Sequence, residues 1–288
     1  MRAKHRLPWL WILVLSLGIP GWSQTILEIK HADTWSYDAE SGTQVLEGNV
    51  DMAYEGMMIR AARIRFKTSQ ETNELEAAEA EGSVQVIEEG KVARGERAEC
   101  DFRRGLLHLK GNASVQQGNN VIQAKEIHFV RDSSAMTAVG TVSGNFAGPS
   151  GGAQQGLRLE KAEKWVFDPA KHLHDLQGNP VVHMQDTKIS ASRIMLQMDE
   201  KDEGILRADT EPPVEIVKGD LRATADSATY FPAGDAEERL VLKGNAKMYQ
   251  GQNFMSGDEI IFFPATGSMK GKNVQVTIQV EENAGGMP

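Results

Sequence analysis

The stretch Gly48-Asn49-Val50-Asp51-Met52-Ala53-Tyr54 decides the fold class of this 288-residue chain. Its large apolar residues Val50, Met52 and Tyr54 fall two apart, which is the period of a β-strand and not of a helix. The Gly-Asn pair in front tolerates positive φ angles, which tight turns and bulges require. The stretch therefore predicts a strand with one apolar face that begins at a sharp bend.

This mark recurs along the chain. Further copies begin at Gly82, Gly111, Gly140, Gly178, Gly244 and, more loosely, Gly271, while Pro212-Pro213 stands where one copy is due. A second mark alternates with the first and reads small residue, two residues, apolar residue, one residue, aromatic or apolar residue. It occurs at 32–37, 61–66, 124–129, 162–167, 191–196, 225–230 and 257–262. A long internal repeat of this kind predicts one structural unit that is stacked many times.

The repeated unit predicts an all-β protein. Strands with one apolar and one polar face are typical of antiparallel sheets that bury a single face. Regular bends at the glycines would fold the sheet into an elongated, twisted sandwich with an apolar interior along its length. The segment 73–81 has helical propensity but occupies a strand position in the repeat, so a strand is expected there.

The first residues predict export. Arg2, Lys4 and Arg6 precede an apolar run of about a dozen residues, shorter than the roughly 20 that a membrane-spanning helix needs. Residues 1–23 therefore read as a signal peptide, and the periplasm is the expected location. An uncleaved anchor in the inner membrane, with the rest facing the periplasm, is the alternative. The Gly-rich loop 148–156 would separate a first module at 24–147 from a second at 157–283.

Composition argues against several classes of function. The net charge is −9 and the basic residues are scattered, whereas a nucleic-acid-binding protein needs a basic face. The lone Cys100 reads as a small buried hydrophobe. His172 and His174 lie two apart but lack a nearby third ligand, so surface positions are expected for both. We expect no catalytic residues, no metal and no cofactor, and hence no enzyme.

At this point the units resemble a known family. Leu46-Glu47-Gly48-Asn49-Val50, then 61–66, then 75–84, are similar to the OstA-like module, the β-jellyroll shared by LptA, LptC and the N-terminal part of LptD. The resemblance covers most of residues 26–280. It implies a protein that carries lipopolysaccharide across the periplasm from the inner to the outer membrane, in a bridge with other Lpt-type jellyroll proteins. The chain departs from the pattern in its length, its mid-chain Gly-rich break and Pro212-Pro213.

The resemblance implies a use for the inward side chains. They would contact the lipid A acyl chains of lipopolysaccharide. Packing in a core is the first role of such residues, and both roles stay open. The predicted lipid-binding residues on the interior face are Ile64, Phe66, Phe102, Ile127, Phe129, Ile194, Leu196 and Phe262.

The two ends of the repeat predict assembly. The segment 273–280 alternates cleanly and has neither proline nor charge, which are the usual guards of an exposed sheet edge. Either it is buried in the sheet, or it is an edge that pairs with residues 25–30 of another copy and gives head-to-tail oligomers. The predicted edge residues are Ile26, Ile29, Val274, Val276 and Ile278.

Two rival functions stay open. One is an exported, repeat-built enzyme that acts on polysaccharides, and it would show shorter coils with a cluster of acidic and basic residues on one face. The other is an LptC-like component that keeps an inner-membrane anchor.

Overall fold

The computed structural model describes residues 26–72, 74–146, 156–200, 202, 204–233 and 237–279. Within these ranges the chain forms antiparallel β-strands and no helix, as the alternating pattern predicts. The strands are β1 (Leu27–His31), β2 (Thr34–Asp38), β3 (Thr43–Tyr54), β4 (Met57–Thr68), β5 (Leu75–Glu88), β6 (Lys91–Asp101), β7 (Leu106–Gln117), β8 (Asn120–Val130), β9 (Ala135–Phe146), β10 (Leu157–Asp168), β11 (Leu173–Gln177), β12 (Val181–Met184), β13 (Thr187–Ser190), β14 (Arg193–Met198), β15 (Ile205–Glu211), β16 (Val214–Lys218), β17 (Leu221–Ala225), β18 (Ser227–Phe231), β19 (Arg239–Gln250), β20 (Asn253–Phe263), β21 (Ser268–Lys272) and β22 (Gln275–Thr277).

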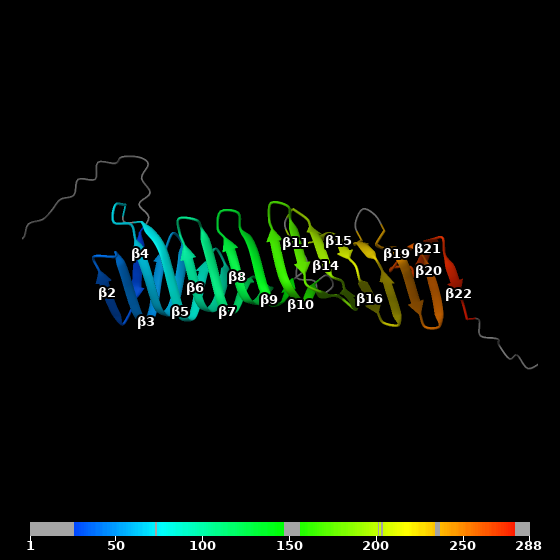
Figure 1. The fold of residues 1–288 in the computed structure, drawn as a ribbon, viewed down its shortest axis with the longest axis horizontal. Coiled ribbons are helices and arrows are strands. Elements are labelled where there is room, and N and C mark those ends of the chain that lie inside the picture. The colour runs from blue at the N-terminus through cyan, green and yellow to red at the C-terminus, as the bar shows by residue number, and fades with distance from the viewer. Residues whose placement is uncertain are drawn as a thin grey trace, which may run out of the picture.

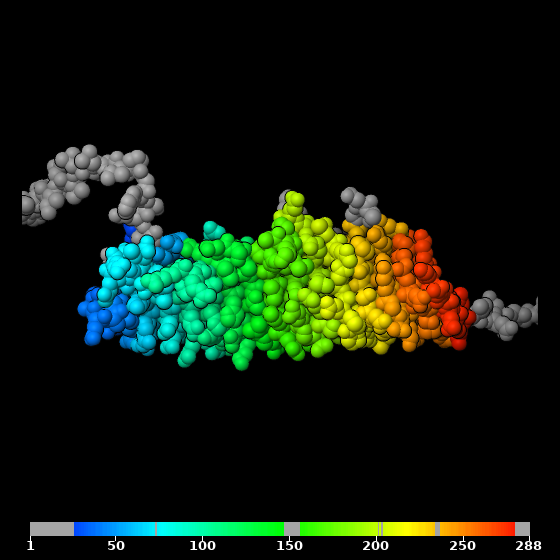
Figure 2. All heavy atoms as spheres, turned by 45° about the horizontal axis from the view of Figure 1, so that its top comes forward, coloured from blue at the N-terminus to red at the C-terminus, as the bar shows by residue number. Residues whose placement is uncertain are grey.

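The strands follow one another along an elongated body. Each long strand pairs with the one before it and the one after it, so the sheet advances in sequence order from β2 at one end to β22 at the other (Figure 1). The same order appears on the surface, where the colours change in bands along the body (Figure 2). Each part of the chain therefore packs mainly against its neighbours in sequence, as expected for a stacked repeat.

The long strands β3, β5, β7 and β19 each bend at the glycine mark. In β3, Glu47 pairs with Arg63 and Val50 pairs with Ala61, so Gly48 and Asn49 stand opposite a single residue. This is a β-bulge, which bends a strand and increases its twist. Gly48 and Asn49 have φ angles of 80° and 47°, a conformation that Gly and Asn adopt far more readily than other residues. The bend therefore sends the two halves of the strand into two facing layers.

At some corners in the C-terminal half the strand is interrupted and forms two shorter strands. β11 and β12 are the halves of one bent strand, and they flank Gly178-Asn179-Pro180. β10 pairs with β11 through its C-terminal half and with β12 through its N-terminal half. Between β15 and β16 the corner is formed by Pro212-Pro213, which a cis peptide bond joins. The proline pair thus occupies the corner that the repeat predicts.

The sheet continues across the middle of the chain. β9 and β10 pair from Phe146 opposite Leu157 to Met136 opposite Phe167. The predicted signal peptide lies outside the described residues, as does the predicted Gly-rich loop apart from Gly156. The division into two modules stays a prediction, since one unbroken run of paired strands joins its two parts.

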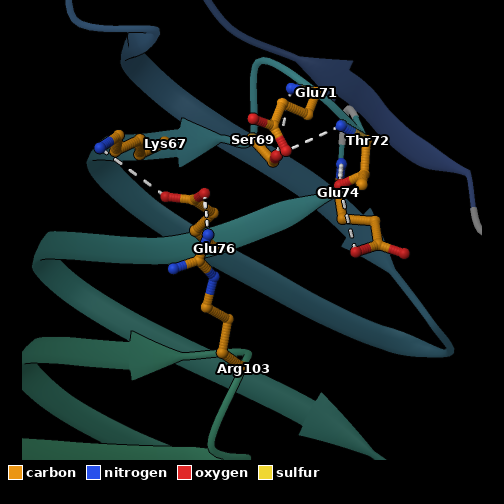
Figure 3. A network of polar contacts seen from close by, with 7 residues as sticks. All are labelled: Lys67, Ser69, Glu71, Thr72, Glu74, Glu76 and Arg103. Carbon is orange, nitrogen blue, oxygen red and sulfur yellow. Dashed lines mark hydrogen bonds and ion pairs between the residues drawn. The ribbon is translucent and has the colours of Figure 1, made fainter.

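Polar contacts hold the segment that connects β4 to β5 (Figure 3). Glu76 on β5 forms ion pairs with Lys67 on β4 and with Arg103 just after β6, so one carboxylate links three neighbouring strands. In the connecting segment the Ser69 hydroxyl accepts hydrogen bonds from backbone N–H groups, one of them that of Thr72 at 3.2 Å. These contacts lie on the polar surface and leave the apolar face to the interior.

Two predictions about local structure have different outcomes. The segment 73–81 is strand from Leu75 onward, which confirms the prediction there. The predicted strand at 273–280 is longer than the observed one, because β22 covers only Gln275–Thr277. Asn273 has a φ of 53° and forms the last corner, and a methyl group of Val274 lies over Gly271. Val280 lies outside the described residues.

Candidate lipid-binding interior

Cross-strand pairing arranges the interior side chains in rows that run the length of the body. We call the first the corner row, because it lies next to the bends. Its members pair from strand to strand in one layer: Trp35, Leu46, Ile64, Ala80, Ala98, Leu109, Ile127, Ala138, Trp165, Leu176, Ile194, Thr210, Ala228, Leu242, Ile260 and Gly271.

A second row, the rim row, lies two residues further from the bends in the same layer. It consists of Tyr37, Gln44, Phe66, Ala78, Cys100, Leu107, Phe129, Met136, Phe167, His174, Leu196, Ala208, Tyr230, Leu240, Phe262 and Met269. The second sequence mark is thus explained, because its apolar residue belongs to the corner row and its last residue to the rim row.

The other layer contributes the facing row. It begins at Ile29 on β1 and ends at Val276 on β22, with these residues between them: Met52, Ile59, Val86, Ala93, Val115, Ile122, Gly144, Leu159, Val182, Ile189, Ile216, Ala223, Met248 and Met255. The three rows give the interior a largely apolar lining, in which Gln44, Thr210 and His174 are polar.

Most of the predicted lipid-binding residues are buried in these rows. Ile64, Ile127 and Ile194 are in the corner row, and Phe66, Leu196 and Phe262 are in the rim row. Phe129 is also in the rim row but is only partly buried, with the Lys91 ammonium 5.5 Å from its ring centre. Phe102 follows β6, is partly buried, and packs edge-to-face on Tyr54 at 5.2 Å. Whether each residue touches lipid or only packs stays a prediction.

The interior opens into a cavity in the C-terminal half of the body. Its volume is about 210 Å³, which exceeds the roughly 150 Å³ of an apolar protein cavity known to bind benzene. Both layers line it, since Leu196 and Phe262 come from the rim row and Ile189 and Ile216 from the facing row. Deeper in the same half, Ile194 lines a void of about 10 Å³. Of the predicted lipid-binding residues, Leu196 and Phe262 line the larger cavity.

Among the described residues, six polar side chains line the cavity: His174, Gln185, Thr187, Lys218, Tyr230 and Glu238. The Tyr230 hydroxyl donates a hydrogen bond to Glu238 at 2.7 Å, and burial together with this contact raises the pKa of Tyr230. Lys218 forms an ion pair of 3.5 Å with Asp186. His174 accepts a hydrogen bond at Nδ1 from the Trp165 indole N–H at 3.2 Å. Burial lowers the pKa of His174 to about 4, so its ring is neutral at neutral pH.

His174 corrects one prediction and is a residue that the sequence reasoning missed. Both His172 and His174 are predicted at the surface, yet His174 is 7% exposed and His172 is half-buried. His172 lies in the turn before β11 and contacts Asp202 at 2.9 Å. The sequence did contain a signal for the burial of His174. His174 lies two residues before the inward-facing Leu176, and residues two apart in a strand share one face.

A second group of histidines lies on the outer face. His108 on β7 is paired with His128 on β8, and their rings stack with centres 3.8 Å apart. Glu126 contacts His108 at 2.9 Å, so the three side chains together have the ligand types of a metal site. The stacked rings lie nearly parallel, at 23°, and one ring would have to turn before both could coordinate one ion. This cluster was also missed, because its members come from two strands.

Cys100 is a rim-row residue. It is buried, and burial raises the pKa of its thiol to about 12. Because the thiolate is the reactive form of cysteine, a thiol that stays protonated suits packing and not nucleophilic chemistry.

The two ends of the body leave apolar side chains uncovered. At the N-terminal end, Ile29 is 41% exposed and Trp35 is 61% exposed. At the C-terminal end, Val276 is 49% exposed. The other predicted edge residues, Ile26, Val274 and Ile278, are exposed as well. Trp35 and Tyr37 were not predicted as edge residues, although they begin the corner and rim rows. All are exposed because, within the described residues, the terminal strands have a neighbour on one side only.

Comparison with known proteins identifies the family. A family model described as "LptA/(LptD N-terminal domain) LPS transport protein" matches residues 29–134 and 161–268, which is most of the chain. The chain therefore belongs to this family of lipopolysaccharide transport proteins. Its role lies in lipopolysaccharide transport, in the periplasm or facing it, and members of the family are transport components and not enzymes.

Among solved structures, the chain is similar to LptH of Pseudomonas aeruginosa, described as the LptA homologous periplasmic component of the conserved lipopolysaccharide transport device. The identity is 16% and the TM-score is 0.37, over 40% of this chain and 82% of LptH. No curated protein sequence matches the chain. In the part of the chain that the structure describes, no helix is long and apolar enough to cross a membrane.

Proposed function

We propose that this protein shields the acyl chains of lipopolysaccharide inside its sandwich, without catalysis, as one part of a periplasmic protein bridge. The observation that carries the proposal is the cavity of about 210 Å³ between two layers of aliphatic and aromatic side chains. Moving an acyl chain into water costs about 0.8 kcal/mol for each CH₂ group. A dozen such groups cost on the order of 10 kcal/mol, so a chain crossing an aqueous compartment needs a lining of this kind.

The ends of the body suit a bridge. The facing row ends in Ile29 on β1 and Val276 on β22. Strand β1 pairs with β3 near the end of the body where β2 lies, and β22 lies at the other end (Figure 1). Each of these two residues belongs to a strand that has pairing partners on one side only within the described residues. Pairing β22 of one molecule with β1 of the next would continue the facing row across the contact. The same contact fits another jellyroll protein at either membrane.

The decisive test compares two adjacent residues of β14. Leu196 lines the cavity, whereas Met195 belongs to the opposite face of the strand. A photo-crosslinking residue at position 196 should capture lipopolysaccharide in the cell envelope, and one at position 195 should not. Equal capture at both positions, or none at position 196, would show that the interior is only a core.

Intact-mass measurement of the same envelope protein separates the exported form from the LptC-like alternative. A mass that lacks residues 1–23 supports export with cleavage, and a mass that retains Met1 supports an anchored component.

A further inference from the structure

The cavity has one unpaired hydrogen-bond donor in its wall. His174 is 7% exposed, and its Nε2 atom has no hydrogen-bond partner. Its Nδ1 atom accepts a hydrogen bond from Trp165, so in the neutral ring the proton is on Nε2. The burial that lowers the His174 pKa keeps the ring neutral. Nε2–H is therefore a donor, and the ring that carries it lines the cavity.

The position of His174 is held by aromatic packing. Its ring centre lies 4.7 Å from that of Phe167, 5.6 Å from that of Trp165 and 5.3 Å from that of Phe146. Trp165 and Phe167 belong to β10, and Phe146 is the last residue of β9. With three rings around it and Nδ1 engaged, the imidazole cannot turn Nε2 toward another partner without breaking the Trp165 contact.

Other polar groups at the cavity have partners, as Lys218 has in Asp186. The Tyr230 hydroxyl is bonded to Glu238, and the Thr210 hydroxyl, which borders the deeper void, is bonded to the backbone of Ala228. A buried donor without a partner lowers stability, so native proteins rarely keep one unless it serves a ligand or an ordered water. Among the buried polar groups of the described lining, the His174 Nε2–H is thus a donor without a partner; Nε2 itself is closed off in this structure, so a bound oxygen reaches it through a small shift of the lining.

We propose that His174 Nε2–H donates a hydrogen bond to an oxygen atom on the chain that the cavity holds, such as a hydroxyl, ester or amide oxygen. The cavity would then prefer an apolar chain that carries an oxygen over a plain hydrocarbon chain. This inference rests on the proposed function, because it assumes that the cavity takes an apolar chain. It adds a residue that determines which chain is held best.

The test uses two probes of nearly equal length, 2-tetradecanone and tetradecane. Each displaces the fluorescent dye N-phenyl-1-naphthylamine from the purified protein. The wild-type protein should bind the ketone between about twofold and tenfold more tightly, which is what one hydrogen bond contributes. His174→Phe keeps an aromatic ring but has no N–H donor, so it should bind the ketone and the hydrocarbon with equal affinity. His174→Gln keeps an N–H donor and should restore part of the preference.

A spectroscopic measurement on the wild-type protein alone gives an independent result. In protein labelled with ¹⁵N-histidine, the Hε2 signal of His174 should move downfield with the ketone and stay in place with tetradecane. Equal binding of both probes without this shift overturns the role of His174 and leaves the proposed function standing. Binding of neither probe overturns the proposed function, and the role of His174 falls with it.

Discussion

A Cβ atom built on Gly82 would lie 2.7 Å from the Cβ atom of Ala62, on the neighbouring strand. The same relationship recurs at five other corners, where the space above the glycine is taken by a side chain from the segment that precedes it. The pairs are Gly48 with Asp33, Gly111 with Glu96, Gly140 with Lys125, Gly178 with Glu163 and Gly244 with Asp226. The two sequence marks therefore meet in space, because the covering residue directly follows the small residue of the second mark or its equivalent.

At several corners the asparagine adds a hydrogen bond to the same neighbour. Asn112 donates to Glu96 at 2.7 Å, and Asn245 donates to Asp226 at 2.8 Å. At these corners the Gly-Asn pair thus has two roles, namely adopting the positive φ angles and contacting the strand before it.

Replacing Gly82 by alanine should therefore destabilise the protein more than replacing Gly90. Both glycines have positive φ angles, 79° and 76°, and alanine in this region costs roughly 1–2 kcal/mol in either case. Gly90 has nothing within 4 Å of the added Cβ. Gly82→Ala also meets Ala62, and overpacking adds about 1–3 kcal/mol. Urea denaturation measures both changes, and Ala62→Gly should recover the additional loss in Gly82→Ala. Equal losses at Gly82 and Gly90 would contradict the packing argument.

Much of the fold follows from the sequence, because its two marks report backbone properties. Alternation in 48–54 and its copies sets the strand period, and Gly48-Asn49 sets the bend. The prediction of a strand at 273–280 was wrong at its start. There Asn273 adopts a positive φ angle and forms a corner inside the predicted strand. The sequence shows the repeat, but it does not show how the two layers pack against each other. That packing decides where a cavity remains between them.

The location of the cavity could not be predicted for that reason. Small rim-row residues such as Ala78 and Ala208 occur in both halves of the body, so the pattern along one strand does not show where a cavity remains. It depends on the volumes of side chains from both layers, as with Leu196 opposite Ile189 and Ile216. His174 was missed because His172 and His174 were judged as a pair that lacks a third metal ligand and were therefore expected at the surface. Alternation with Leu176 places His174 inside.

Filling the cavity should block lipid capture. Leu196→Trp places a larger side chain into the cavity lined by Phe262, so lipopolysaccharide captured by a photo-crosslinking residue at position 262 should fall several-fold. Met195→Trp, on the opposite face of the same strand, should leave capture unchanged. Urea denaturation confirms that both variants fold. Undiminished capture in folded Leu196→Trp would mean that the acyl chain does not enter this cavity.

Charges at the ends of the facing row should stop assembly. Ile29→Lys and Val276→Lys each place an ammonium group where the row would continue into a second molecule, and desolvating it opposes the contact. Because both positions are about half exposed, each variant should fold normally and sediment as a monomer. Gln275→Lys, on the other face of β22, should still form oligomers.

Mixing the two variants tests the head-to-tail arrangement directly. Ile29→Lys retains an intact C-terminal edge and Val276→Lys retains an intact N-terminal edge, so the mixture should form dimers and nothing larger. Longer oligomers in the mixture, or a strictly monomeric wild-type protein at high concentration, would rule out this contact.

The stability of the protein should fall in mild acid because of His174. Its pKa is about 4 in the folded protein and about 6.5 in an unfolded chain, so the unfolded state binds the additional proton between these values. The stabilisation is therefore present above pH 6.5 and is lost as the pH falls toward 4. Between pH 7 and pH 5 the free energy of unfolding should decrease by about 2 kcal/mol through this group alone. Urea denaturation of wild type and His174→Phe at both pH values isolates the effect, since the variant lacks the titrating ring. If the two proteins lose the same stability between pH 7 and pH 5, His174 is not buried in its neutral form, and the hydrogen-bond donor proposed for the cavity loses its basis.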